Sequence, residues 1–133
     1  MRIADYLMKN YYPRCPKALV PTKEQINQAI LNHPEKIIIV RNKGIVCIAI
    51  FLTLSDSTYS QLERYDLRDV EVIKELCLET GNNLHFVLCA ADGFKSIRIG
   101  MRRLIKNLKP KTVSWWNPEF NKLHRYEVKT CHS

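Results

Sequence analysis

The chain has 133 residues, of which 21 are Lys or Arg and 13 are Asp or Glu, so its formal net charge is +8. This length suits one domain, and an apolar fraction of 46% with 26% charged residues excludes a disordered chain or a coiled coil. No apolar run approaches the roughly 20 residues of a membrane span. The first residues carry no apolar signal region, so we expect a cytoplasmic protein.

The excess positive charge is confined to the last part of the chain. Residues 1–94 carry 11 basic and 11 acidic side chains, whereas residues 95–133 carry 10 basic side chains and two acidic ones, Glu119 and Glu127. A basic segment of this size is typical of proteins that contact nucleic acid, a phosphorylated cofactor or an acidic partner. A solvated basic surface without any partner is the alternative.

Cysteine and histidine are scattered and do not form a metal-binding pattern. The five cysteines include no C-x-x-C pair, and three of them lie inside apolar runs. We therefore interpret them as small core residues, and expect neither disulfides nor a structural metal site.

The first third of the chain predicts a helix after an irregular start. Residues 1–21 contain three prolines and are expected to be irregular, apart from a short amphipathic stretch over 3–8. Thr22 is a predicted N-cap, with Gln25 three residues later completing a capping box, and Pro34 ends that helix.

The middle of the chain predicts a hairpin followed by helix. Two β-branched runs, 36–41 and 45–53, are separated by a turn in which Gly44 accepts a positive φ. Residues 55–69 are polar and aperiodic, which indicates a loop or a weak helix. Residues 70–80 have helical spacing and are followed by a glycine.

The last third predicts a strand, a helix and two further strands. A buried strand over 83–91 leads to an amphipathic helix over 94–108 with one apolar and one basic face. Strands over 112–116 and 122–129 follow. The sequence therefore predicts a single α/β (α+β) domain over 1–133: a mixed sheet with a β-hairpin, a central parallel βαβ unit and flanking helices.

The turn between the 83–91 strand and the next helix carries the most informative chemistry. Helix N-termini expose N–H groups and a positive dipole end, which suit phosphate. Here the turn has Gly93 and the cations Lys95 and Arg98, with Gly100 further into the helix. A plain structural turn, in which the glycines relieve strain and allow close packing, is equally consistent with this spacing.

The element order and these residues resemble the GNAT superfamily of N-acyltransferases, nearest in pattern to the RTX toxin-activating acyltransferases and the small GNAT-like proteins of phages. In that superfamily a turn of the form Arg/Gln-x-x-Gly-x-Gly/Ala holds the pyrophosphate of acyl-coenzyme A. The stretch 95–100 (KSIRIG) keeps the basic first position and the last glycine. Arg98 replaces the middle glycine, and it either crowds the pyrophosphate or supplies charge to it.

The resemblance implies an enzyme that transfers an acyl group from acyl-coenzyme A, such as acetyl-coenzyme A, to an amine. Asp92 is the candidate base, and Tyr126 or His124 is the candidate proton donor to the thiolate. His85 either faces the cleft or belongs to the core. The candidate cofactor-binding residues are Cys89, Ala91, Gly93, Lys95, Ser96, Arg98, Gly100, Trp116 and Asn117.

The adjacent tryptophans Trp115 and Trp116 are expected to point to opposite faces of the sheet, one into the core and the other toward a cleft or solvent. The sequence leaves two functions open. The first is a GNAT-like N-acyltransferase, of a kind also encoded by phages. The second is a catalytically inactive GNAT-like module that contacts nucleic acid, or a virion or host protein, through its basic last third.

Overall fold

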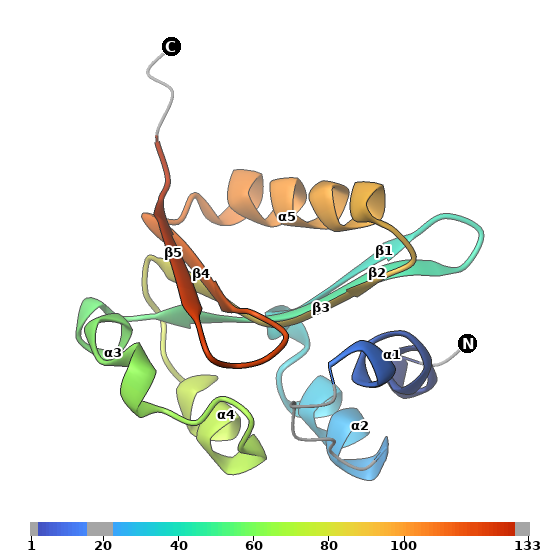
Figure 1. Ribbon diagram of the computed structural model, residues 1–133, viewed down its shortest axis with the longest axis horizontal. Helices are drawn as coiled ribbons and strands as arrows, with labels where there is room; N and C mark the ends of the chain where they lie inside the picture. Colours follow the sequence, from blue (N-terminus) through green and yellow to red (C-terminus); the bar gives the residue numbers. More distant parts are fainter. Residues whose placement is uncertain (1–2, 16–22, 130–133) are drawn as a thin grey trace.

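The apolar runs of the sequence pair into one sheet in the computed structural model, which describes residues 3–15 and 23–129 (Figure 1). The strands lie in the sheet in the order in which they occur along the chain. They are β1 (Ile37–Arg41), β2 (Ile45–Leu54), β3 (Asn83–Ala91), β4 (Thr112–Trp116) and β5 (Leu123–Glu127).

The pairing of the strands confirms the predicted mixed sheet. β1 and β2 form an antiparallel hairpin, and β2 also pairs antiparallel with β3. β3 and β4 are parallel, since the helix that joins them crosses over one face of the sheet, and β5 returns antiparallel to β4. The predicted α/β class and the central βαβ unit are thus correct.

Helices cover both faces of the sheet, and they are divided unequally (Figure 1). One face carries the single long helix α5 (Phe94–Leu108). The other face, the lower one in Figure 1, carries α1 (Ile3–Asn10), α2 (Lys23–Asn32), α3 (Asp56–Ser60) and α4 (Val70–Leu76). Short 3-10 turns lie at Tyr12–Arg14, Pro34–Lys36 and Leu62–Arg64. No helix in the described ranges is both long and apolar enough to cross a membrane.

The amphipathic stretch expected over 3–8 is α1, whereas the rest of the segment expected to be irregular contains, within its described part, the 3-10 turn Tyr12–Arg14. α1 and the 3-10 turn Tyr12–Arg14 are ordered because Leu7 and Tyr12 pack into an apolar cluster with Ile48 of β2. The sequence signal was weak because prolines flank these turns. The predicted N-cap Thr22 lies outside the described residues.

Helix α5 packs closely on the hairpin at one point. Gly100 is buried, and a Cβ atom there would lie 3.2 Å from Cys47 Sγ. Further along the helix, Leu104 is buried in a cluster with Phe51 and Phe86 of the sheet. The apolar face predicted for this helix is therefore the face that contacts the sheet.

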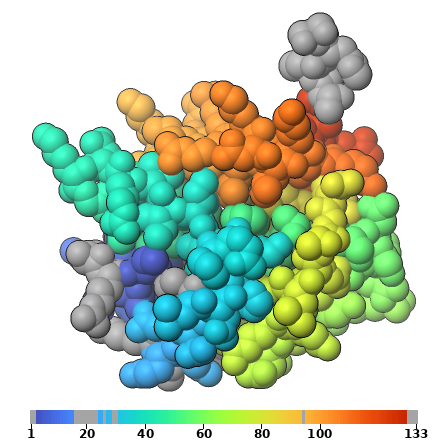
Figure 2. Space-filling view, turned by 180° about the vertical axis from the view of Figure 1, so that it is seen from behind, coloured from blue at the N-terminus to red at the C-terminus, as the bar shows by residue number. Residues whose placement is uncertain are grey.

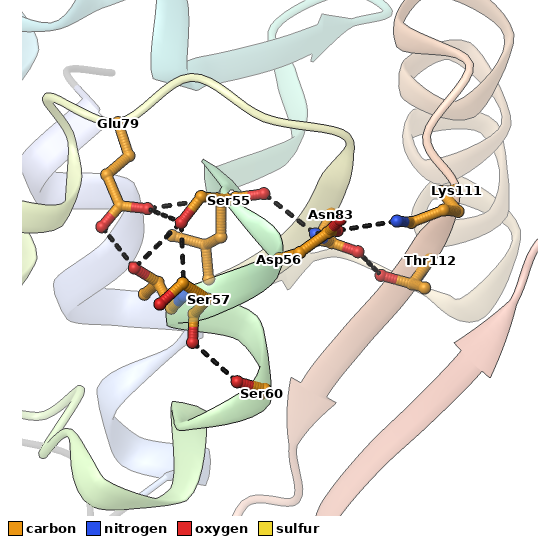
Figure 3. A network of polar contacts seen from close by, with 10 residues as sticks. Ser55, Asp56, Ser57, Ser60, Glu79, Asn83, Lys111 and Thr112 are labelled. Carbon is orange, nitrogen blue, oxygen red and sulfur yellow. Dashed lines mark hydrogen bonds and ion pairs between the residues drawn. The ribbon is translucent and has the colours of Figure 1, made fainter.

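A network of polar side chains joins the end of β2 to α3 and to the segment after α4 (Figure 3). Ser55 caps α3, and the carboxylate of Glu79 accepts hydrogen bonds from Ser55 N (3.1 Å), Ser55 Oγ (3.0 Å) and Thr58 Oγ1 (2.6 Å). Burial would raise the pKa of Glu79, but the hydrogen bonds from Thr58 and Ser55 outweigh it and lower that pKa.

The same network reaches the first residues of β3 and β4. Asn83 is fully buried, donates to Leu54 O (3.1 Å) and Asp56 Oδ1 (2.9 Å), and accepts from Thr112 Oγ1 (2.7 Å). Lys111 Nζ lies 2.7 Å from Asp56 Oδ1 and lowers the pKa of that carboxyl. These contacts hold one end of the two parallel strands together (Figure 3).

The cysteines that the structure describes are free thiols. Cys15, Cys47 and Cys77 are buried, and Cys89 is half-buried. Cys131 lies outside the described residues. No group of three or more His, Cys, Asp or Glu side chains with metal-binding geometry occurs within 3–15 and 23–129.

Candidate functional site

β3 contains a bulge at the centre of the sheet. Ile50 of β2 pairs with Leu88, but the next residue, Phe51, pairs with Phe86, so Val87 has no counterpart on β2. Val87 and Leu88 therefore both face the lower helices, where they belong to different apolar clusters. Such a bulge bends a strand and increases its local twist.

The bulge coincides with the point at which β3 and β4 separate. Their parallel pairing runs from Asn83 and Thr112 to Phe86 and Trp115 and then ends, although β3 continues to Ala91. One edge of β3 beyond the bulge therefore has no strand beside it. Backbone N–H and C=O groups on such an edge are available to a ligand.

A cavity of about 350 Å³ fills the gap between the separated strands. Its walls come from both faces of the sheet, so the cavity passes between the two strands. Cys89, Ile97 and Met101 lie on the α5 side, and Val87 and Trp116 on the lower side. Most of the lining is apolar, as is typical of small-molecule sites. The remaining lining residues are Tyr11, Cys15, Phe86, Leu88, Trp115, Asn117, Pro118 and Phe120.

A second, smaller apolar space of about 90 Å³ adjoins this cavity and lies between the sheet and the lower helices. Tyr11, Val87, Leu88 and Phe120 line both spaces. The two therefore share a wall at the bulge, and together they extend from the gap between the strands toward α4.

The turn from β3 into α5 lies at the far end of the same strand. Gly93 is the N-cap in an extended conformation (φ −175°), and no side chain in the described ranges hydrogen-bonds the first turn as a cap. An added Cβ at Gly93 would meet nothing within 4 Å, so the helix start is open to solvent. Lys95 and Arg98 are exposed, and Ser96 is half-exposed, in the first turns of the helix.

Asp92 is exposed at this turn and its carboxylate Oδ1 accepts a hydrogen bond from Ser96 Oγ at 2.7 Å. Its backbone N–H donates to Val46 O, which also accepts from the hydroxyl of Tyr6 at 3.0 Å. Burial and the nearby Asp92 charge both raise the pKa of Tyr6. Tyr6 and Asp92 are thus neighbours although they are distant in sequence.

Arg14 is a further charged residue at this end of β3 that sequence reasoning missed. Its Nη1 atom lies 3.5 Å from the carbonyl oxygen of Ala91. It is the last residue of the 3-10 turn that packs under the sheet, and its sequence context, a single Arg among prolines and tyrosines, gives no sign of this placement.

Cys89 reaches the cavity as a protonated thiol. Its Sγ lies 4.0 Å from Cys47 Sγ, and the hydrogen bond between the two sulfurs, together with burial, raises the pKa of Cys89. The same contact lowers the pKa of Cys47, which is fully buried. Cys89 is therefore a wall of the cavity and a poor nucleophile.

His85 belongs to the core and does not line the cavity, which decides between the two placements considered for it. Its ring is fully buried, Nδ1 lies 2.8 Å from Ser114 Oγ, and Nε2 finds no hydrogen-bond partner among the described residues. Burial, and then the charge of Arg125, lower the pKa of His85 to about 3. The alternation of the strand places it toward Leu52 and the lower helices.

The two tryptophans point to opposite faces, as predicted. Trp115 packs with the α5 cluster and its ring stacks with His124 (5.4 Å between centroids) and with Tyr126 (5.3 Å). Trp116 packs with the cluster under α3 and α4. Tyr126 is 58% exposed on the edge strand β5.

The predicted site residues therefore do not gather in one place. Cys89, Trp116 and Asn117 line the cavity; Asp92, Gly93, Lys95, Ser96 and Arg98 form the turn at the start of α5; Ala91 is buried at the end of β3. Gly100 contacts the hairpin, and Tyr126 lies in the stack on β5.

The comparisons with known proteins add no relative to this description. No protein-family model matches the chain, and no curated protein is similar to it.

Proposed function

We propose that this protein is a GNAT-like N-acyltransferase that binds an acyl-coenzyme A between β3 and β4. The observation that carries the proposal is the separation of these strands beyond Phe86 and Trp115, next to the bulge at Val87, with a cavity of about 350 Å³ in the gap. Two parallel strands that separate in this way offer an extended ligand one free strand edge and an apolar channel.

The site offers possible partners to the different parts of this donor. Its pantetheine arm, which carries amides, would pair with the free backbone groups of β3 beyond Val87. Its pyrophosphate would lie at the uncapped start of α5, where backbone N–H groups and the cations Lys95 and Arg98 are available. Arg14, which lies against Ala91 O, adds a third cation at this end.

The acyl group would pass through the sheet toward the lower helices. The smaller apolar space under the bulge, bounded by Leu88 and Phe120, would receive acyl chains longer than acetyl. Most of its lining is apolar, which favours methylene groups, although Gln25, His33, Lys36 and Arg68 also line it.

The reaction would join the nitrogen of an acceptor amine to the carbonyl carbon of the thioester and break the carbon–sulfur bond. Backbone N–H groups near Cys89 and Ala91 would stabilise the developing oxyanion. The amine would lose its proton to water, since Asp92, the expected base, lies in the turn where the pyrophosphate would bind and does not line the cavity. The sulfur leaves as the thiol of coenzyme A after it gains a proton.

Calorimetric titration with a series of acyl-coenzyme A species tests the proposal. We expect saturable binding that depends on acyl chain length. Cys89→Phe, which places a ring in the cavity, should weaken binding at least tenfold, while the matched variant Leu78→Phe, at a position 74% exposed, should bind as the unmodified protein does. Circular dichroism would establish that both variants are folded.

A second pair of variants tests the placement of the pyrophosphate. Lys95→Glu reverses a charge at the start of α5 and should weaken binding, whereas Lys109→Glu makes the same change just past the other end of the helix and should not. Absence of binding to every acyl-coenzyme A tested, with the protein folded, would refute the proposed function.

A further inference from the structure

The outer face of α5 is basic from one end to the other. The helix contains no acidic residue, and the side that faces away from the sheet is covered by no other element (Figures 1 and 2). The exposed cations on it and directly after it are Lys95, Arg98, Arg102, Arg103, Lys106 and Lys109.

These cations have no acidic partners within residues 3–15 and 23–129. The ion pairs of this part of the chain lie elsewhere, for example Lys111 with Asp56 (2.7 Å) and Lys74 with Glu71 (3.4 Å). A basic face that serves only solubility usually has acidic residues interspersed with the basic ones. The outer face of α5 has none, so its charge is available to an anionic ligand.

An exposed aromatic stack lies on the same side of the sheet. Tyr126 pairs with Val113 and His124 pairs with Trp115, and both β4 residues belong to the cluster under α5. The rings of Trp115 and Tyr126 are nearly parallel, with an interplanar angle of 9°. Since Tyr126 is 58% exposed, the stack presents an aromatic surface at the sheet edge, next to the basic helix.

We infer that α5 and the Tyr126 stack form a binding surface for single-stranded nucleic acid. Cations along a helix suit a phosphate backbone, and an exposed aromatic ring suits an unpaired base, which stacks without regard to sequence. A duplex hides its bases from such a ring, and an acidic protein has no need of it. The inference does not need the acyltransferase activity, but the two proposed sites share Lys95 and Arg98, and Trp115 also lines the cavity, so the variants below change other residues.

Fluorescence anisotropy with a labelled oligothymidylate of about 16 nucleotides tests the charge. The double variant Arg102→Gln/Lys106→Gln should weaken binding and reduce the slope of log K against log salt by about 1.4, because each lost phosphate contact removes about 0.7. The control Lys9→Gln/Arg64→Gln removes two exposed charges from α1 and from the 3-10 turn Leu62–Arg64, under the sheet, and should change neither.

The variant Tyr126→Ala tests whether the aromatic stack binds unpaired bases. It should weaken binding of oligothymidylate by about fivefold or more, and leave unchanged the binding of an abasic strand of equal length. Fluorescence of Trp115, which lies against Tyr126, should be quenched by the strand that has bases. The inference is overturned if the protein does not bind oligothymidylate at low salt, if both double variants lose affinity equally, or if the abasic strand binds as tightly. The last result would indicate a ligand recognised by charge alone, such as an acidic protein.

Discussion

Acidification should destabilise this fold through one side chain, His85. The ring is fully buried between β2 and β4, with Nδ1 2.8 Å from Ser114 Oγ, and burial lowers its pKa from 6.5 to about 3. At a pH between these two values the folded protein keeps the ring neutral, while the unfolded chain binds a proton there. The proton therefore favours the unfolded state, and stability falls as the pH is lowered.

The size of this effect follows from the two pKa values. The contribution is complete above pH 6.5, the unfolded value, and below it declines until the pH reaches the folded value of about 3. The slope in this window is about 1.4 kcal/mol per pH unit, so that about 2 kcal/mol is lost between pH ~7.5 and pH ~5.

Urea unfolding at these two pH values, extrapolated to water, measures the loss. His85→Gln should be less stable at neutral pH but should lose little more on acidification, because glutamine does not titrate. Ser114→Ala is the matched control: it removes the hydrogen bond but leaves the buried imidazole, so it should keep the full pH dependence. If His85→Gln lost as much stability on acidification as the unmodified protein, the buried ring would not be the cause.

Two further predictions concern the turn after α4. Glu79→Gln removes the charge that Thr58 hydrogen-bonds, and should lower the free energy of unfolding at neutral pH by roughly 1 kcal/mol. The pKa of Glu79 is lowered in the folded protein, so its contribution to stability is present above pH 4.5 and is lost as the pH falls through the folded value. The variant should therefore lose less stability in acid than the unmodified protein. An unchanged dependence of stability on pH would contradict this. Gly81→Ala places a Cβ 2.1 Å from Leu54 O and should cost about 1–3 kcal/mol in urea unfolding. The control Gly93→Ala meets open space, and an equal cost at both positions would show that contact with Leu54 is not the reason.

The sequence predicted the elements best where periodicity and end signals agree. The expected bounds of β3, β4 and α5 match the structure, because continuous apolar runs and a two-faced helix are local patterns. The predicted helix over 70–80 is longer than α4 (Val70–Leu76), since its last residues leave the helix where Glu79 turns back to accept hydrogen bonds from Ser55.

The site was harder to predict because it depends on contacts between distant residues. The turn at Gly93 follows from local sequence, but the bulge at Val87 depends on how β3 meets β2, and a run of apolar residues does not reveal it. Arg14 and Tyr6 reach the end of β3 only through the packing of α1. The sequence left open whether His85 faces a cleft or the core, because alternation along a strand does not say which face other side chains cover.

The order of the strands in the sheet has a consequence for how the chain folds. Each strand lies beside the one before it in the sequence, from β1 through β5, so every new strand finds its partner already formed. The β1–β2 hairpin can nucleate within microseconds, whereas β3 must first close the segment that carries α3 and α4. During synthesis the sheet can therefore grow from β1 toward β5 as the chain emerges, and β5 is the last strand to pair.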